Sequence, residues 1–242
     1  MGIAGMSDTA ASPPERRFSN ADEMNDALAS EIAARLKARI ASDGRASLVA
    51  TGGTTPGPLY DRLCRADLPW DRVQVTLTDE RWAATDDAAS NEALVRSRLL
   101  TGPAAAATMV GLKTSDPAPP AAVGTVDARL AAMPRPFEVT VLGMGDNGHI
   151  ASLFPHAPEL AVAQSGEGFV CAVVQESAAG ASQRLSMTLR ALLDTRWIAI
   201  LIQGREKLET YRRALTVGGI TELPVRMVLR QNQAPVELWW AP

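Results

Sequence analysis

Three glycines and a histidine follow the end of one apolar, β-rich segment of the chain. The segment Phe137 to Leu142 has the length and composition of a buried strand, and it stops at Gly143. Gly145 and Gly148 come next, and His149 follows at once. Glycine allows a tight turn and the close approach of a ligand. Imidazole titrates near neutral pH and can serve as a general base. We therefore expect this loop to carry the chemistry of the protein.

A second glycine-containing turn has the sequence T-G-G-T-T-P and ends at Pro56. It separates a short expected strand, Ser47 to Ala50, from a helix whose first turn Pro56 suits. The free N–H groups of a helix start, its dipole and two hydroxyls would form a phosphate cradle. An ordinary strand-to-helix turn with a Thr cap explains the residues equally well. No Gly-Lys-Ser/Thr follows, so the turn is not a nucleotide P-loop. The turn residues are Gly52, Gly53, Thr54 and Thr55.

Acidic and basic side chains follow a further expected strand, Val73 to Thr78. Asp79 and Arg81 come directly after it, and Trp82 follows. Ligands bind at the carboxyl ends of strands in open α/β sheets. An isolated D-E-R sequence is, however, more often a surface ion pair beside a packed tryptophan. The sequence indicates a helix after Ser90, which is a good N-cap residue.

The composition is that of an ordinary globular protein. The chain has 242 residues, 46% of them hydrophobic and 21% charged, and a formal net charge of −3. No bulk basicity indicates nucleic acid or an anionic membrane, and no apolar run is long enough to span a bilayer. Cys64 and Cys171 match no metal-binding spacing and lie among apolar residues, which indicates reduced core thiols in a cytoplasmic protein. His156 lies among prolines, as expected for a surface loop.

Strand-like and helix-like segments alternate along the chain. The first helix is expected from Ser19 or Asn20 to Gly44, with an apolar residue every fourth position. The alternation predicts an α/β fold with a mostly parallel, doubly wound sheet and helices on both faces. We expect a flexible leader over residues 1–17 and a single domain over residues 18–242.

The loop after the central strand matches the dinucleotide-binding pattern G-x-G-x-x-G. That fold requires a continuous helix from the loop, which Pro155 and Pro158 would interrupt. It also requires an acid at the end of the next strand, whereas Glu167 lies in a turn-like S-G-E-G sequence. A nucleotide-dependent oxidoreductase is therefore the weaker interpretation of this loop.

Three stretches taken together support another interpretation: T-G-G-T-T-P, T-D-E-R-W with Ser90 and Asn91 after it, and L-G-M-G-D-N-G-H-I-A-S-L-F-P. In this order they resemble the 6-phosphogluconolactonase family, as do Q-R-L-S-M-T-L around Arg184 and Q-G-R-E-K around Lys207. The resemblance implies a modified Rossmann-like fold and hydrolysis of 6-phospho-D-glucono-1,5-lactone in the pentose phosphate pathway. It implies no nucleotide, no other cofactor and no obligatory metal. The partner it implies is a sugar phosphate, and the protein would be a monomer or a small homo-oligomer.

The resemblance also implies roles for particular residues. His149 would activate water, and Arg81 would contact the lactone end or its oxyanion. Asp79 would bind sugar hydroxyls. The phosphate would lie on the Gly52–Thr55 turn, with Arg184 and Lys207 as charge partners. Gly145 would complete the substrate-binding loop.

The chain departs from the family pattern at Asn147, where many members have Asp. An amide can orient an imidazole but does not stabilise imidazolium as a carboxylate does, so the partner of His149 is left open between Asn147, Asp146 and a backbone carbonyl. The related glucosamine-6-phosphate isomerases carry a Glu after G-H-I-A, and here Ser152 to Pro155 contain no acid. A non-catalytic sugar-phosphate sensor is a further alternative, although it would not need His149.

Overall fold

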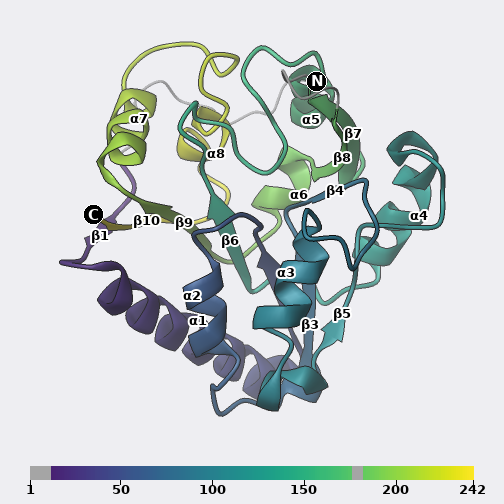
Figure 1. Cartoon of the computed structure of the whole chain (residues 1–242). Coiled ribbons are helices and arrows are strands. Elements are labelled where there is room, and N and C mark those ends of the chain that lie inside the picture. Colours follow the sequence, from purple (N-terminus) through teal and green to yellow (C-terminus); the bar gives the residue numbers. More distant parts are fainter. Residues whose placement is uncertain (1–11, 176–181) are drawn as a thin grey trace.

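The structure is a computed structural model that describes residues 12–175 and 182–242. Its centre is a seven-stranded sheet in which every neighbouring pair of strands is parallel (Figure 1). The mostly parallel α/β sheet predicted from the sequence is therefore confirmed. Across the sheet the strands are β1 (Glu15–Arg17), β10 (Val236–Ala241), β9 (Ile198–Gln203), β6 (Val139–Gly143), β2 (Ala46–Ala50), β3 (Val73–Leu77) and β5 (Thr108–Met109).

Helices connect most of these strands. They are α1 (Ala21–Asp43), α2 (Gly57–Leu63), α3 (Asn91–Arg98), α4 (Pro119–Ala131), α5 (Glu159–Ser165), α6 (Leu189–Leu193), α7 (Arg205–Leu215) and α8 (Arg226–Leu229), with 3-10 turns at Trp70–Arg72 and Gly102–Ala106. The longest, α1, begins and ends as the sequence predicts. Asn20 caps it by accepting a hydrogen bond from the Glu23 N–H, and Gly44 ends it with a left-handed φ of 76°.

A second, three-stranded antiparallel sheet lies beside the parallel one. Its order is β4 (Asp79–Arg81), β8 (Ser182–Met187) and β7 (Val170–Gln175). The sequence analysis predicted one mostly parallel sheet and did not foresee this second, antiparallel one. A parallel connection needs a dozen or more residues. Only residues 176–181, outside the described part of the chain, lie between β7 and β8, and a short connection of this kind favours an antiparallel pair.

The prediction of a flexible leader over residues 1–17 is wrong for residues 15–17. Glu15–Arg17 form β1, which pairs in parallel with β10, and Phe18 stacks on Trp239 with ring centroids 5.5 Å apart. Short polar strands of this kind have no apolar alternation that a sequence pattern could reveal. They form because the neighbouring strand offers free backbone groups.

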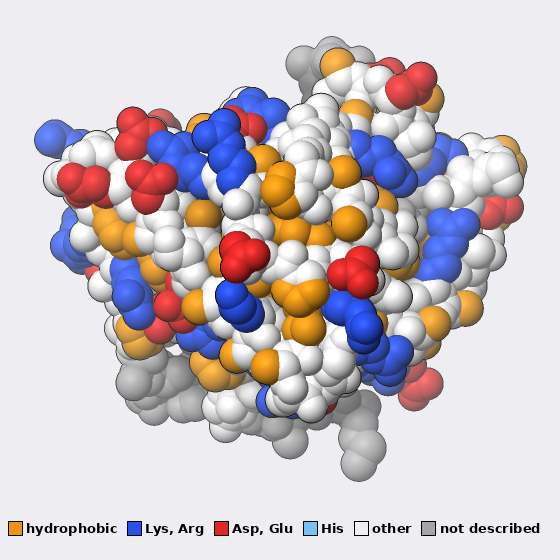
Figure 2. All heavy atoms as spheres, turned by 90° about the horizontal axis from the view of Figure 1, so that it is seen from below, with side chains coloured by type: hydrophobic (Ala, Val, Ile, Leu, Met, Phe, Trp, Pro, Cys, Tyr) orange, Lys and Arg blue, Asp and Glu red, His pale blue; other side chains and the backbone are white. Residues whose placement is uncertain are grey.

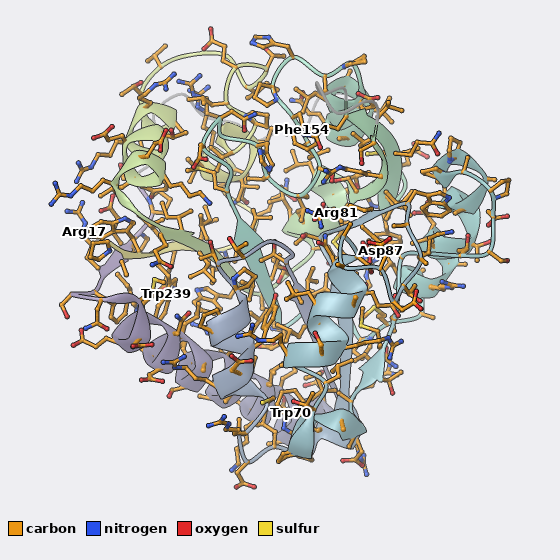
Figure 3. All side chains as sticks on the ribbon, in the orientation of Figure 1. Arg17, Trp70, Arg81, Asp87, Phe154 and Trp239 are labelled. Carbon is orange, nitrogen blue, oxygen red and sulfur yellow. The ribbon has the colours of Figure 1, made fainter. Side chains whose placement is uncertain are left out.

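The hydrophobic core fills the space between the sheets and the helices. Trp70, Trp197 and Trp239 are among its largest fully buried side chains. In Figure 3, Trp70 lies at the lower end of the molecule, Arg81 near its middle and Phe154 above Arg81. The lower face, shown in Figure 2, carries interspersed acidic and basic side chains, with small apolar areas between them.

A buried carboxylate holds β4 against the start of α3. Glu80 has no exposed surface, and its two oxygens accept hydrogen bonds from four donors. The donors are the N–H groups of Arg81, Asn91 and Glu92 and the hydroxyl of Ser90, at 2.7–3.0 Å. The carboxylate thereby satisfies N–H groups that the helix start leaves free and complements its dipole. This arrangement replaces the surface ion pair that D-E-R alone suggested.

We expect Glu80→Gln to lower the free energy of unfolding by about 1–3 kcal/mol, because the amide NH₂ would face a donor that the carboxylate now accepts from. Denaturant unfolding measures this change. The control is Glu209→Gln on the exposed face of α7, which should change stability by no more than about 0.5 kcal/mol. Equal stabilities of the two variants would show that Glu80 does not hold this helix start.

Candidate active site

A cleft of about 280 Å³ opens where β2, β3, β6 and β9 end. These strands are neighbours in one parallel sheet, so their carboxyl ends meet at the same edge. The cleft therefore collects loops that are far apart in the sequence. Its lining residues are Thr51, Gly52, Gly53, Thr54, Thr55, Pro56, Asp79, Arg81, Asn91, Gly143, Met144, Gly145, Asp146, His149, Ala151, Arg184, Leu201 and Lys207.

Thr51 begins the first of these loops and is anchored by Tyr60 of α2. The Tyr60 hydroxyl donates to the Thr51 carbonyl at 2.7 Å and accepts from the Thr51 N–H at 2.9 Å. The Thr51 Oγ1 also lies 3.4 Å from both the Gly143 N–H and the Thr78 hydroxyl, so it links the ends of three strands. After this anchor Gly53 takes a left-handed φ of 91°, and Thr54 is exposed to the cleft. The loop is thus held at its base and open at its tip.

The second loop holds His149 in a tight turn. The Gly145 N–H donates to the His149 carbonyl at 3.0 Å, and Gly148 has a left-handed φ of 77°. The imidazole packs on Phe154 with ring centroids 4.7 Å apart. Gly145 is required for space, because a Cβ there would lie 2.0 Å from the imidazole Cε1. No helix follows this loop until Glu159, so the continuous helix of a dinucleotide-binding fold is not present.

Asn147 orients the imidazole. Its Oδ1 lies 2.7 Å from His149 Nδ1 and also accepts the backbone N–H of His149 at 3.2 Å. An amide oxygen carries no hydrogen and can only accept hydrogen bonds. The donor in its contact with the ring must therefore be Nδ1, which carries the proton. Nε2 is then left with the lone pair that a general base needs. Of the three partners left open by the sequence, the structure selects the Asn147 side chain.

Burial lowers the pKa of His149 below its ordinary value. The carboxylate of Asp79 raises this pKa, the positive charges of Arg184 and Lys207 lower it, and Asp146 raises it, all less than burial lowers it. The imidazole is therefore neutral at pH 7. A neutral ring with Nδ1 protonated is the form that can remove a proton from water.

Asp79 is a buried acceptor at the edge of the cleft. The Thr78 hydroxyl donates to its Oδ1 at 2.9 Å, and the Ser152 hydroxyl donates to its Oδ2 at 2.6 Å. Arg184 Nη1 lies 4.0 Å from the same Oδ2. Ser152 follows His149 closely in the sequence, so its bond to Asp79 ties the histidine loop to β4.

Arg81 and Arg184 lie directly opposite each other across the β4–β8 pair. Like charges at opposed positions of a sheet are destabilising. Both Nε atoms are buried without a hydrogen-bond partner among the described residues. Burial lowers the pKa of Arg184, and the charge of Arg81 lowers it further. An anion in the cleft would relieve this repulsion and supply the missing acceptors.

Lys207 completes the positive charge at this edge. It lies in the first turn of α7, directly after β9, and lines the cleft. The lining thus holds three cations and the two carboxylates of Asp79 and Asp146, so it is net positive in a chain whose net charge is −3. The positive charge is local, as an anionic ligand requires.

The structure brings all but one of the expected site residues into the cleft lining. The exception, Asn147, is exposed and reaches the site through His149. Sequence reasoning did not assign a role to Thr51, Asn91 or Ser152, which the structure adds. Within residues 12–175 and 182–242, no three His, Cys, Asp or Glu side chains gather where a metal ion could bind. Over the same residues, no helix has the length and hydropathy to span a membrane.

Comparison with known proteins finds a matching family, sequence relatives and solved structures over most of the chain. Residues 19–240 match the family described as glucosamine-6-phosphate isomerases/6-phosphogluconolactonase. The chain is 40% identical to a 6-phosphogluconolactonase of Pseudomonas putida over 89% of this chain and 87% of that one. It is also 40% identical to one of Caulobacter vibrioides, over 93% and 95% of the two chains. A crystal structure of a 6-phosphogluconolactonase from Shewanella baltica superposes with a TM-score of 0.90 at 36% identity, covering 95% of this chain and 98% of that one.

We expect Asn147→Asp to raise the pKa of His149, because a carboxylate stabilises imidazolium where the amide does not. In the wild type this pKa should lie below 6.5. Proton NMR titration of the imidazole measures both values. With only two histidines in the chain, a His156→Asn background leaves a single imidazole signal to follow. A wild-type value above 6.5 would contradict the lowering of this pKa by burial, and no rise in the variant would contradict the hydrogen bond between Nδ1 and the side chain at position 147.

Proposed function

The chain belongs to the glucosamine-6-phosphate isomerase/6-phosphogluconolactonase family, and we propose that it hydrolyses 6-phospho-D-glucono-1,5-lactone to 6-phosphogluconate. The observation that carries this proposal is the neutral His149, oriented by Asn147, within a cleft lined by three cations. A base beside an anion-binding site suits the addition of water to a phosphorylated ester. The relatives from Pseudomonas putida and Caulobacter vibrioides, each 40% identical to this chain, are named for that activity.

In the proposed mechanism His149 acts first as a base and then as an acid. Nε2 takes a proton from water as the water oxygen bonds to the C1 carbonyl carbon. The carbonyl oxygen becomes an oxyanion. When this intermediate collapses, the bond from C1 to the ring oxygen breaks, and the imidazolium returns the proton to that leaving oxygen. Asn147 Oδ1 accepts a hydrogen bond from Nδ1–H in both steps and keeps Nε2 directed toward the water and then the leaving oxygen.

Charges around the cleft would stabilise the two anionic parts of the reaction. We assign Arg81 to the oxyanion and the Gly52–Thr55 turn, with Arg184 and Lys207, to the phosphate. Asp79 lies near enough to raise the pKa of His149 and would favour the transient imidazolium. Its oxygens also remain able to accept sugar hydroxyls, since each carboxylate oxygen has more than one lone pair.

The isomerase activity of the same family is less well supported. In the isomerase sites that this loop resembles, a Glu side chain supports the catalytic histidine. Here Nδ1 of His149 contacts the side-chain amide of Asn147 instead. The residues that follow His149 also contain no acid up to Pro155. We further propose that the protein acts in the cytoplasm on a sugar phosphate, without a nucleic-acid or membrane partner. Both cysteines are free thiols, as in a reducing compartment.

We expect His149→Ala to lower hydrolysis by about 10²–10⁴-fold while 6-phosphogluconate still binds. The rate is measured on freshly generated lactone through 6-phosphogluconate dehydrogenase, corrected for spontaneous opening. Glucosamine 6-phosphate with detection of released ammonia tests the isomerase in parallel. The control is His156→Asn, at an exposed position outside the cleft lining. Hydrolysis at the wild-type rate in His149→Ala would refute the mechanism. Binding of 6-phosphogluconate without any wild-type acceleration would indicate a sensor.

We expect Arg184→Ala to raise KM for the lactone by about 10- to 100-fold, because a charged hydrogen bond to phosphate is lost. The effect on kcat should be smaller, since the phosphate is remote from C1. Steady-state kinetics measures both constants. Arg190→Ala on α6 is the matched control, because Arg190 packs on Phe169 and does not line the cleft. An unchanged KM would remove Arg184 from the phosphate site.

A further inference from the structure

The turn that we assign to phosphate, Gly52–Thr55, has buried residues at both ends and exposed residues between them. Thr51, just before the turn, is 5% exposed, and Pro56, just after it, is buried, whereas Gly53 and Thr54 are exposed. Thr51 lies beyond the last residue of β2 that pairs in the sheet, so a side chain has to satisfy its backbone N–H and C=O groups. The shape of the exposed part depends on what holds its two ends.

Tyr60 of α2 holds both ends of this turn. Its hydroxyl donates to the Thr51 carbonyl at 2.7 Å and accepts from the Thr51 N–H at 2.9 Å. Its backbone N–H donates to the Pro56 carbonyl at 3.0 Å. Burial raises the pKa of Tyr60, so the hydroxyl keeps the proton that it donates. One buried residue thus fixes where the turn begins and where it passes into the helix.

The Tyr60 hydroxyl cannot be replaced by an aromatic ring alone. A ring without the oxygen would leave the N–H and the C=O of Thr51 unpaired in a buried position, which is costly. The backbone would have to move to find other partners. Gly52 and Gly53 follow directly and resist such a movement least, because glycine has the widest conformational freedom. The movement would therefore reach the exposed residues that would contact the phosphate.

The chain contains a second buried tyrosine that lacks these contacts. Tyr211 of α7 is the only other tyrosine in the sequence, and like Tyr60 it has no exposed surface. Its hydroxyl has no hydrogen-bond partner among the described residues. A buried tyrosine is therefore not by itself an anchor. The paired hydrogen bonds to Thr51 are what distinguish Tyr60.

We propose that Tyr60 is a positioning residue that sets the affinity of the cleft for phosphate, by holding the Gly52–Thr55 turn in its binding conformation before the substrate arrives. The inference rests on the proposed function and deepens it. Tyr60 does not line the cleft and acts through Thr51. Without this anchor the turn would occupy its binding conformation only part of the time, and the apparent affinity would fall by that fraction. His149 is oriented separately by Asn147, so bound substrate should still react at the wild-type rate.

The experiment compares Tyr60→Phe with Tyr211→Phe, since each substitution removes only a hydroxyl. We expect Tyr60→Phe to weaken the binding of 6-phosphogluconate and of inorganic phosphate by about 5- to 30-fold, measured by calorimetry well below the unfolding temperature. KM for the lactone should rise by a similar factor, while kcat stays within about twofold of the wild type. Tyr211→Phe should bind and react as the wild type does.

Thermal unfolding of the same proteins separates this role from a merely structural one. A hydroxyl that only supports the fold would lower the unfolding temperature of Tyr60→Phe and leave the affinity of the folded protein unchanged. That result, or an equal loss of affinity in Tyr211→Phe, would overturn the assignment. If the wild type binds 6-phosphogluconate without hydrolysing the lactone, the proposed reaction fails and the binding series still tests Tyr60. A wild type that binds neither ligand would overturn both proposals.

Hydrogen exchange in the wild type gives a second readout, which does not require Tyr60→Phe to fold. We expect the Thr51 amide to exchange slowly in the free protein, because the Tyr60 hydroxyl accepts from it. The amides of Gly53 and Thr54 should become protected only when inorganic phosphate is added. A Thr51 amide that exchanges as fast as that of Thr54 in the free protein would show that the turn is not held at its base, and would overturn the proposal.

Discussion

The site depends on one constraint, the adjacency of β2 and β6 in a parallel sheet. Because parallel neighbours end at the same edge, the turn after β2 and the histidine loop after β6 must face a common space. Thr51 fixes the position of these two loops relative to each other, because its hydroxyl oxygen lies 3.4 Å from the backbone nitrogen of Gly143. The antiparallel sheet then closes one side of this space with Arg81 and Arg184.

The electrostatics of the cleft follow from burial as much as from charge. Burial holds His149 neutral, and the surrounding cations act in the same direction. Arg81 and Arg184 are kept opposite each other despite their repulsion, since each is fixed by a short strand in the second sheet. The fold thus holds positive charge in place before any ligand binds. Such preorganised charge stabilises an anion without further rearrangement of the protein.

Two glycines of the cleft serve to make room for side chains. Gly145 admits the imidazole of His149, and Gly52 admits the amide of Asn91. Glycine-rich loops are commonly interpreted through backbone freedom, which applies here to Gly53 and Gly148. Gly53 and Gly148 are required for their backbone conformation, whereas Gly52 and Gly145 are required because a Cβ would clash with a side chain that only the folded chain brings near.

Local patterns in the sequence determined the helix starting at Asn20, the strands β2, β3 and β6, and the loops that carry His149 and Thr54. Hydrophobic periodicity, capping residues and glycines are local signals, and they fix local structure. Tertiary structure alone decided that Glu15–Arg17 join β10, that β4, β7 and β8 form a separate sheet, and that Glu80 caps α3. It also decided that Asn147 holds Nδ1 of His149 and that the Asn91 amide packs against Gly52. These features depend on pairings and side-chain contacts that form only in the folded chain, and neither leaves a periodic trace in the sequence.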